Sequence, residues 1–502
     1  MPNPVAASGN RSARLISQTG CSARRAARRS EPSRVLLGLA LGLSASLPLA
    51  GCGSVGSVRN LVAGPPSPYL SGFIGNVVAD EPVAALTGRD VLARGGNAAD
   101  AAVAVGMALS VTLPSRASLG GGGACLAYRA GTGRSPEAFL FTPVGGTAPA
   151  GRDSRPASVP MTARGLFLMQ ARYGSVSFDD LVKPAARIAR SGITVSRALA
   201  DDVAAVKGPL LGDPKARAIF APSGTPIAAG DQLSQPDLAN SLDRIALAGV
   251  GDLYTGLLWQ QFTDAAASAG GGLSRADIRN SVPAQSAPLT VTAGADRVAF
   301  LPPPADGGLG AAAAFRASES GSESGSLANG VVGAWRASHP GAVNGGDYAT
   351  DAQALVDSPS TGGSLGRLPA STSFAVVDRN GGAVACALTM DNLFGTGRVA
   401  GDTGIVLGAS PTRFPMPLLA SSIAWNPTSG SFRAAIAGSG QNDAAIAVAA
   451  ATARALHGAP PSPVTETGRV NAVVCARGLP GDQSACVAST DPRGSGLATR
   501  SD

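Results

Sequence analysis

The clearest alternation of apolar and polar positions lies between residues 371 and 389. Phe374, Val376 and the run Ala383–Ala387 predict two buried strands, and Arg379-Asn380-Gly381-Gly382 between them predicts a tight turn. Before the first strand, residues 357–370 are rich in Ser, Gly and Pro, which predicts a mobile segment without helix or strand. A flexible segment therefore leads directly into a strand that begins with Ser371 and Thr372.

Two helices are expected between Glu81 and Leu109. Pro82 suits a first helical turn, and Arg94-Gly95-Gly96 predicts the end of the first helix. Asn97 is a favourable N-cap for the second helix, with Asp100 three residues later near its positive end.

The hydroxyl residues at the start of the strand suggest a chemistry. Cleavage before such a residue leaves an α-amine beside the hydroxyl, and this amine can act as the general base for a nucleophile. On its own, a Ser or Thr at a strand start is more often an ordinary turn residue.

The N-terminal segment predicts export. Seven arginines precede an apolar run, residues 35–50, that is too short for a typical membrane span of about 20 residues. The run ends in Leu49-Ala50-Gly51-Cys52, which is typical of a bacterial lipoprotein signal, so we expect residues 1–51 to be removed and Cys52 to be lipidated. An uncleaved membrane anchor is the alternative. The expected location is the cell envelope, on the periplasmic side of a bacterial membrane.

The charge and histidine content exclude several classes of function. Residues 1–51 hold seven Arg and one acid, so +6 of the total +7 leaves with them and the remaining chain is near +1, which does not indicate a nucleic-acid partner. The two histidines, His339 and His457, provide almost no material for a Ser-His-Asp triad or a His-built metal site. We therefore expect no metal and no cofactor.

The sequence makes different predictions for two pairs of cysteines. Cys125 and Cys386 lie in apolar, strand-like runs and are expected to be buried thiols. Cys475 and Cys486 flank a turn, and in an exported protein they either form a disulfide or remain free.

The motifs resemble the gamma-glutamyltransferase family along most of the chain. The matching segments occur in the family's order and span roughly residues 73–494; they include Gly95–Ala104, Leu119–Gly123, Ser158–Leu166, Gly230–Ala239, Pro302–Gly308, Thr372–Gly381, Leu388–Gly397 and Gly401–Ile405. The resemblance implies an N-terminal-nucleophile hydrolase with a four-layer αββα sandwich. It also implies self-cleavage into a large subunit, residues 52–370, and a small subunit, residues 371–502.

The resemblance also implies the residues of the site. It places Ser371 at the nucleophile, or Thr372 if the alignment shifts by one residue, and Thr389 as the residue that hydrogen-bonds it. It places Asp391 at a substrate-binding asparagine of the family. The serine pair of the family matches Ser421 and Ser422, and its oxyanion loop matches residues 438–442, including Gly440 and Gln441.

Two departures from the family concern the substrate. Thr142 stands where an arginine is expected to bind the α-carboxylate of a γ-glutamyl group, and Arg413 stands near the position of the acid that pairs with its α-amine. The implied substrate is a small amide such as glutathione, but these changes predict weak turnover of γ-glutamyl compounds unless Arg116 or Arg398 reaches the pocket. The alternatives are an acylase for another amide and a non-catalytic, lipid-anchored binding protein of the same fold.

Overall fold

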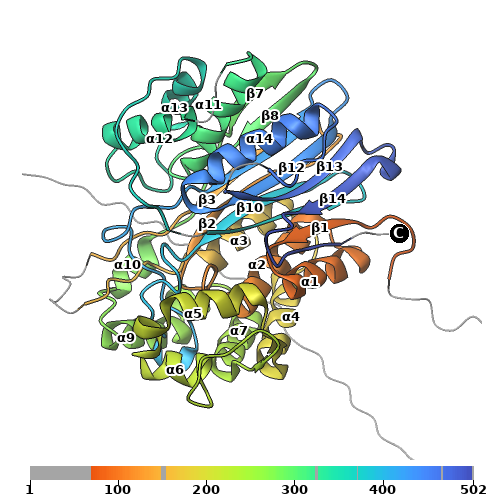
Figure 1. Cartoon of the computed structure of the whole chain (residues 1–502). Coiled ribbons are helices and arrows are strands. Elements are labelled where there is room, and N and C mark those ends of the chain that lie inside the picture. The colour runs from red at the N-terminus through yellow and green to blue at the C-terminus, as the bar shows by residue number, and fades with distance from the viewer. Residues whose placement is uncertain (1–68, 148–153, 323–325, 370, 465–466, 500–502) are drawn as a thin grey trace, which may run out of the picture. The chain divides into compact units, whose positions relative to one another are not determined.

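Two antiparallel sheets lie face to face in the computed structural model, and helices cover the outer side of each sheet (Figure 1). The structure describes residues 69–147, 154–322, 326–369, 371–464 and 467–499. The predicted signal peptide and Cys52 lie outside these residues.

The first sheet has seven strands in the order β15-β1-β9-β10-β2-β3-β6. Its strands are β1 (Gly75–Ala79), β2 (Gly122–Tyr128), β3 (Glu137–Phe141), β6 (Ala284–Ser286), β9 (Ser371–Asp378), β10 (Ala383–Thr389) and β15 (Leu497–Ala498). The predicted strand pair forms the middle of this sheet, because β9 and β10 lie between β1 and β2.

The second sheet has six strands in the order β14-β13-β12-β11-β8-β7. Its strands are β7 (Leu289–Ala293), β8 (Asp296–Phe300), β11 (Ala420–Asn426), β12 (Ser431–Ser439), β13 (Arg469–Leu479) and β14 (Cys486–Thr490). A separate pair consists of β4 (Ile193–Thr194) and β5 (Gln232–Leu233).

The helices fall into two groups. The first group packs on the outer side of the first sheet and contains α1 (Pro82–Ala93), α2 (Ala98–Thr112), α3 (Thr162–Tyr173), α4 (Phe178–Ser191), α5 (Arg197–Leu211), α6 (Pro214–Phe220), α7 (Pro236–Ala248), α8 (Asp252–Thr255), α9 (Leu257–Ser268) and α10 (Arg275–Asn280). The second group covers the second sheet and contains α11 (Gly307–Glu319), α12 (Leu327–Ser338), α13 (Ala349–Asp357) and α14 (Ala444–Leu456).

The first two helices begin and end as the sequence predicts. Pro82 occupies the first turn of α1, and Asn97 caps α2 by accepting hydrogen bonds from the N–H groups of Ala99 and Asp100. Asp100 accepts in return from the N–H of Asn97, which completes a capping box.

Side chains alternate between faces along each strand and divide the core into layers. On β9, Phe374 and Val376 pack against the first group of helices, whereas Ala375 and Val377 pack against the second sheet. The expected four-layer αββα sandwich is therefore confirmed.

The four cysteines among the described residues form two disulfides, Cys125–Cys386 and Cys475–Cys486. The prediction that Cys125 and Cys386 are free thiols was wrong. Both are buried as expected, but β2 and β10 are neighbours and their register places the two residues directly opposite each other. In the described part of the chain, no helix is long and apolar enough to cross a membrane.

Candidate active site

Ser371 and Thr389 lie opposite each other on adjacent strands. They are register partners at the ends of β9 and β10, and both point toward the second sheet, because they share the face of Ala375 and Ala385. Ser371 is 1% exposed, and its Oγ makes no hydrogen bond among the described residues. A buried hydroxyl without a partner is unusual enough to require an explanation.

Thr372 points to the other face of β9 and is part of a polar network around Asp80. Its Oγ1 donates to Asp80 Oδ2 at 2.9 Å, and the backbone N–H of Ser373 donates to the same oxygen at 3.1 Å. Asn471 of β13 donates to Asp80 Oδ1 at 2.8 Å and to the carbonyl of Ser373 at 2.9 Å. This network ties the start of β9 to the second sheet.

The two candidate serines of β11 point in opposite directions. Ser421 faces the first sheet, since it shares the side of Ile423, and its buried Oγ has no described partner. Ser422 faces outward, where its Oγ lies 2.8 Å from Thr452 Oγ1 of α14. The fold thus directs Ser421 toward the side of Ser371 and directs Ser422 away from it.

The loop between β12 and α14 has an unusual backbone at both of its candidate residues. Gly440 has a φ of 122°, and Gln441 has a φ of 56°, in the left-handed region that costs a residue with a side chain about 1 kcal/mol or more. The loop leads into the N-terminus of α14, where backbone N–H groups favour negative charge.

Asp391 is a buried carboxylate two residues after the end of β10. It is 0% exposed, its N–H donates to Thr389 Oγ1 at 2.9 Å, and neither carboxylate oxygen has a hydrogen-bond partner among the described residues. Burial raises the pKa of its carboxyl well above the ordinary value, and the positive charge of Arg336 opposes this only in part. Its φ of 60° is also left-handed.

A cavity of about 470 Å³ lies beside Thr142. Its walls are mostly apolar and come from four stretches of chain: Thr142–Gly145, Pro304 with Asp306, Trp335–Val343 in part, and Pro411–Met416 in part. Thr142 itself is engaged, because its Oγ1 donates to Asn344 Oδ1 at 2.9 Å.

Arg336 of α12 is the arginine that lines this cavity, and the sequence analysis missed it. Its Nε and Nη2 donate to both oxygens of Asp306 at 2.6 and 2.8 Å, so its charge is largely balanced within the protein. Arg116 and Arg398, named as the exceptions that could supply the missing charge, are bound elsewhere: Arg116 pairs with Asp202, and Arg398 donates to the carbonyl of Ala269. No sequence signal connects α12 to this cavity, since only the tertiary fold brings them together.

Arg413 lies on the exposed turn after Ser410, next to Thr412 in the cavity wall. Arg413 itself does not line the cavity, and the acid that does, Asp306, is paired with Arg336.

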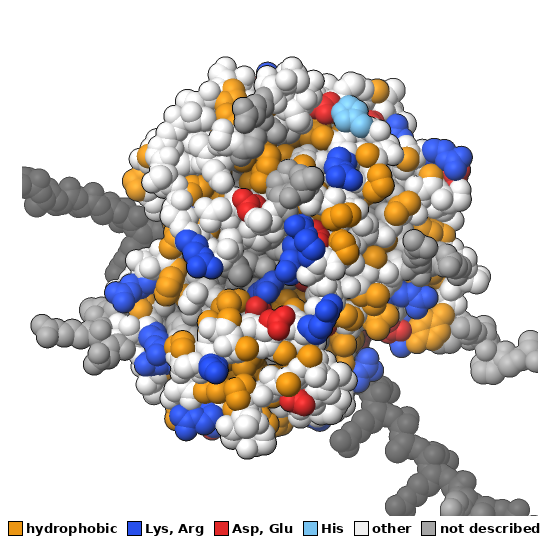
Figure 2. Space-filling model, in the orientation of Figure 1, with side chains coloured by type: hydrophobic (Ala, Val, Ile, Leu, Met, Phe, Trp, Pro, Cys, Tyr) orange, Lys and Arg blue, Asp and Glu red, His pale blue; other side chains and the backbone are white. Residues whose placement is uncertain are grey.

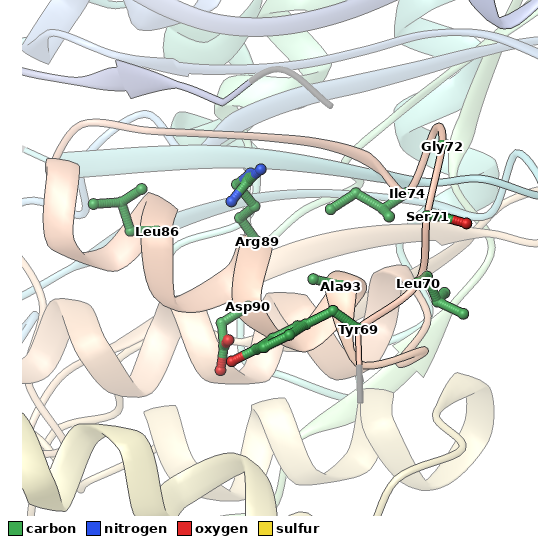
Figure 3. A pocket seen from close by; sticks show the side chains of 9 residues that line it. All are labelled: Tyr69, Leu70, Ser71, Gly72, Ile74, Leu86, Arg89, Asp90 and Ala93. Atoms are coloured by element: carbon green, nitrogen blue, oxygen red, sulfur yellow. The ribbon is translucent and has the colours of Figure 1, made fainter. Parts of the chain in front are cut away.

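Other surface features contain none of the candidate residues. A hollow of about 610 Å³ lies between α1 and the segment before β1, where Tyr69, Leu86, Arg89 and Asp90 line it (Figure 3). Basic and acidic side chains are interspersed on the face seen in Figure 2, without a broad basic field. Within the described ranges, no group of His, Cys, Asp or Glu side chains could hold a metal ion.

The arrangement suits acyl transfer to a hydroxyl. Ser371 Oγ lies at a strand start, where an α-amine would appear upon cleavage, and Thr389 is its neighbour across the strand pair. Ser421 and Asp391 provide further polar groups that are desolvated, so their interactions with a substrate would be strong.

Comparison with known proteins places the chain in a family. The gamma-glutamyltranspeptidase family model matches residues 84–322. The chain is 30% identical over 411 residues to the glutathione hydrolase proenzyme of Escherichia coli (strain K12), a match that covers 70% of this chain and 71% of that protein. It is 33% identical over 232 residues to the Acylase ACY 1 proenzyme of Pseudomonas sp. (strain SE83), covering 42% of this chain and 41% of that one.

Among solved structures, the cephalosporin acylase from Bacillus halodurans shares the fold, with a TM-score of 0.63 and 17% identity over 87% of this chain and 98% of that one. At 17% identity this structural match shows only the fold, whereas the sequence matches show the family. The chain belongs to the gamma-glutamyltranspeptidase family of N-terminal-nucleophile hydrolases.

Proposed function

We propose that this protein cleaves itself between Ala370 and Ser371 and then uses Ser371 to hydrolyse or transfer the acyl group of γ-glutamyl amides. The observation that carries the proposal is the buried Ser371 Oγ, which lies opposite Thr389 and has no described partner. Thr372 fits the role of nucleophile less well, because its hydroxyl already donates to Asp80. Relatives described as proenzymes support processing of a precursor.

Self-cleavage and substrate turnover both use Ser371 Oγ as the nucleophile. In self-cleavage, Ser371 Oγ attacks the carbonyl carbon of residue 370, the amide C–N bond breaks, and the nitrogen takes the hydroxyl proton; water then hydrolyses the resulting ester. The freed α-amine can accept the proton of Ser371 Oγ in each later turnover, and N–H groups of the 438–442 loop can stabilise the oxyanion. Ser371 Oγ attacks the carbonyl carbon of the substrate amide, the C–N bond breaks, and the leaving amine takes the proton held by the α-amine. The resulting acyl-enzyme then passes its acyl group to water or to an acceptor amine, and Ser371 Oγ regains a proton.

Intact-mass measurement of the purified protein tests self-cleavage. The wild type should give a small fragment of 132 residues (502 − 371 + 1), Ser371→Ala should remain a single chain, and Thr372→Val should still be split. A Ser371→Ala protein that is cleaved at the same bond would refute the proposal. A wild type that stays whole would favour the non-catalytic binding protein instead.

The cavity beside Thr142 favours a second candidate substrate class, with an acyl group other than γ-glutamyl. Its walls are mostly apolar, and Asp306, the acid that lines it, is already paired with Arg336 and so is not free to bind an α-ammonium group. These features favour an acyl group without the charged α-amino acid part, as an acylase would use.

A matched pair of substrates tests whether the enzyme acts on γ-glutamyl amides or on acyl groups without the charged α-amino acid part. The pair is a γ-glutamyl anilide and a glutaryl anilide, which differ mainly at the α-amino group. Losing one charge-assisted hydrogen bond costs roughly 1.5–3 kcal/mol, or about ten- to a hundredfold in binding. We expect weak turnover of both compounds, with kcat/KM values within about tenfold of each other. A preference above about a hundredfold for the γ-glutamyl anilide would show that the pocket recognises the charged group after all.

We also propose that the protein is exported and anchored to the periplasmic side of a bacterial membrane by lipid on Cys52. The basic and apolar run before Leu49-Ala50-Gly51-Cys52 supports this, and so do two disulfides, which are typical of oxidising compartments. Cys52→Ala should move the protein from the membrane fraction to the soluble fraction. Unchanged membrane association of that variant would contradict lipid anchoring.

A further inference from the structure

The carboxamide of Asn442 holds the backbone of the segment that precedes Ser371. The N–H of Leu368 donates to Asn442 Oδ1 at 3.0 Å, and Asn442 Nδ2 donates to the carbonyl of Gly366 at 3.0 Å. One side-chain amide thus satisfies a donor and an acceptor two residues apart, as a neighbouring strand would.

The same segment is fixed at two other points. The Leu368 side chain is 2% exposed and packs in the core between the second sheet and its outer helices. Farther back, the N–H of Gly362 donates to the carbonyl of Gly330 in α12 at 3.2 Å. The helix allows this approach because Gly333 has no side chain: a Cβ there would lie 2.4 Å from the carbonyl oxygen of Gly362.

These contacts restrict a stretch that the sequence predicts to be mobile. Residues 359–369 contain no helix or strand and are mostly exposed, but their backbone is bound at Gly362, Gly366 and Leu368. Leu368 is three residues before Ser371, so its Cα lies within about 11 Å of that of Ser371.

We propose that Asn442 is a positioning residue for self-cleavage: it clamps Gly366 and Leu368 and so fixes the chain that carries the Ala370–Ser371 bond. The inference rests on the proposed cleavage before Ser371. The Ser371 hydroxyl must approach the carbonyl of residue 370 closely, and holding reactants in place removes conformational freedom that would otherwise slow the step. Asn442 also belongs to the loop that resembles the oxyanion loop, so the clamp ties this loop to the bond to be cut.

The test measures the first-order rate at which purified precursor converts into two fragments, together with its Tm. Asn442→Ala should slow conversion about tenfold, the effect expected from losing two ordinary hydrogen bonds, while Tm changes little because the side chain is only half-buried. Asn380→Ala, in the exposed turn after β9, is the matched control and should convert at the wild-type rate.

A second set of variants separates clamping from packing. Leu368→Pro removes the N–H donor, whereas Leu368→Ala keeps it and loses only side-chain packing. We expect Leu368→Pro to convert more slowly than Leu368→Ala. Because Leu368→Pro already removes one of the two bonds to Asn442, adding Asn442→Ala to it should slow conversion by a smaller factor than Asn442→Ala does in the wild type.

The outcomes distinguish this inference from the proposed function. If the wild-type precursor never converts, the proposed cleavage is refuted. If the wild type converts and Asn442→Ala converts at the same rate, or if the two changes slow conversion independently, the clamp is refuted and the cleavage stands.

Discussion

At the scale of single residues, the site is defined by buried polar groups that the protein leaves without partners. Ser371, Ser421 and Asp391 all have side-chain oxygens with no described hydrogen bond. Each such group costs stability, so its presence in a folded protein calls for an explanation such as a catalytic or binding role. The three groups come from β9, from β11 and from the segment just after β10, so no local sequence motif contains all of them.

Asp391 gives a test of this cost. Because burial raises the pKa of its carboxyl, the folded state binds a proton that the unfolded state releases above about pH 3.9, and stability declines as pH rises through the interval between the two pKa values. Asp391→Asn removes this penalty. At pH 7.5 the variant should therefore have a higher Tm than the wild type, and its free energy of unfolding should be larger by on the order of 1–3 kcal/mol. This difference in stability should shrink as the pH falls toward 4.

Asp306→Asn is the matched control. It also neutralises a buried carboxylate, but it deprives Arg336 of a bidentate partner and should lower the Tm. If Asp391→Asn lowers the Tm at pH 7.5 as well, then Asp391 is paired in solution and is not an isolated buried acid.

At the scale of elements, the sequence predicts what depends on local pattern. The strands around Phe374 and Ala385, the turn between them and the capped start of α2 all follow from periodicity and capping chemistry. The orientation of Ser421 and Ser422 also follows from the alternation along a strand, once the neighbours Ile423 and Ala424 are assigned to opposite core layers.

Contacts between distant elements could not be predicted in this way. Arg336 reaches the cavity from α12, and Asn442 meets Gly366 from a loop 76 residues away in the chain. Cys125 and Cys386 were correctly expected to be buried, but their pairing depends on the register of β2 against β10. Such facts require the order and register of strands, which hydrophobic pattern alone does not provide.

At the scale of the whole molecule, the proposed cleavage divides the first sheet between two polypeptides. β1, β2, β3 and β6 precede Ser371, whereas β9, β10 and β15 follow or begin with it. The two central strands of that sheet would thus belong to the small subunit and be flanked on both sides by strands of the large one. Backbone hydrogen bonds along these edges would hold the subunits together after cleavage.

The disulfide Cys125–Cys386 adds a covalent link across this division, since Cys125 precedes the proposed cleavage site and Cys386 follows it. Cys475–Cys486, in contrast, lies entirely within the small subunit. We expect the cleaved protein to migrate as one species in denaturing electrophoresis without reductant and as two with reductant. A Cys125→Ala/Cys386→Ala variant should give two species under both conditions, whereas Cys475→Ala/Cys486→Ala should behave like the wild type. Separation of the wild-type subunits without reductant would show that Cys125 and Cys386 remain thiols, and the link between subunits would then rest on the sheet and the core alone.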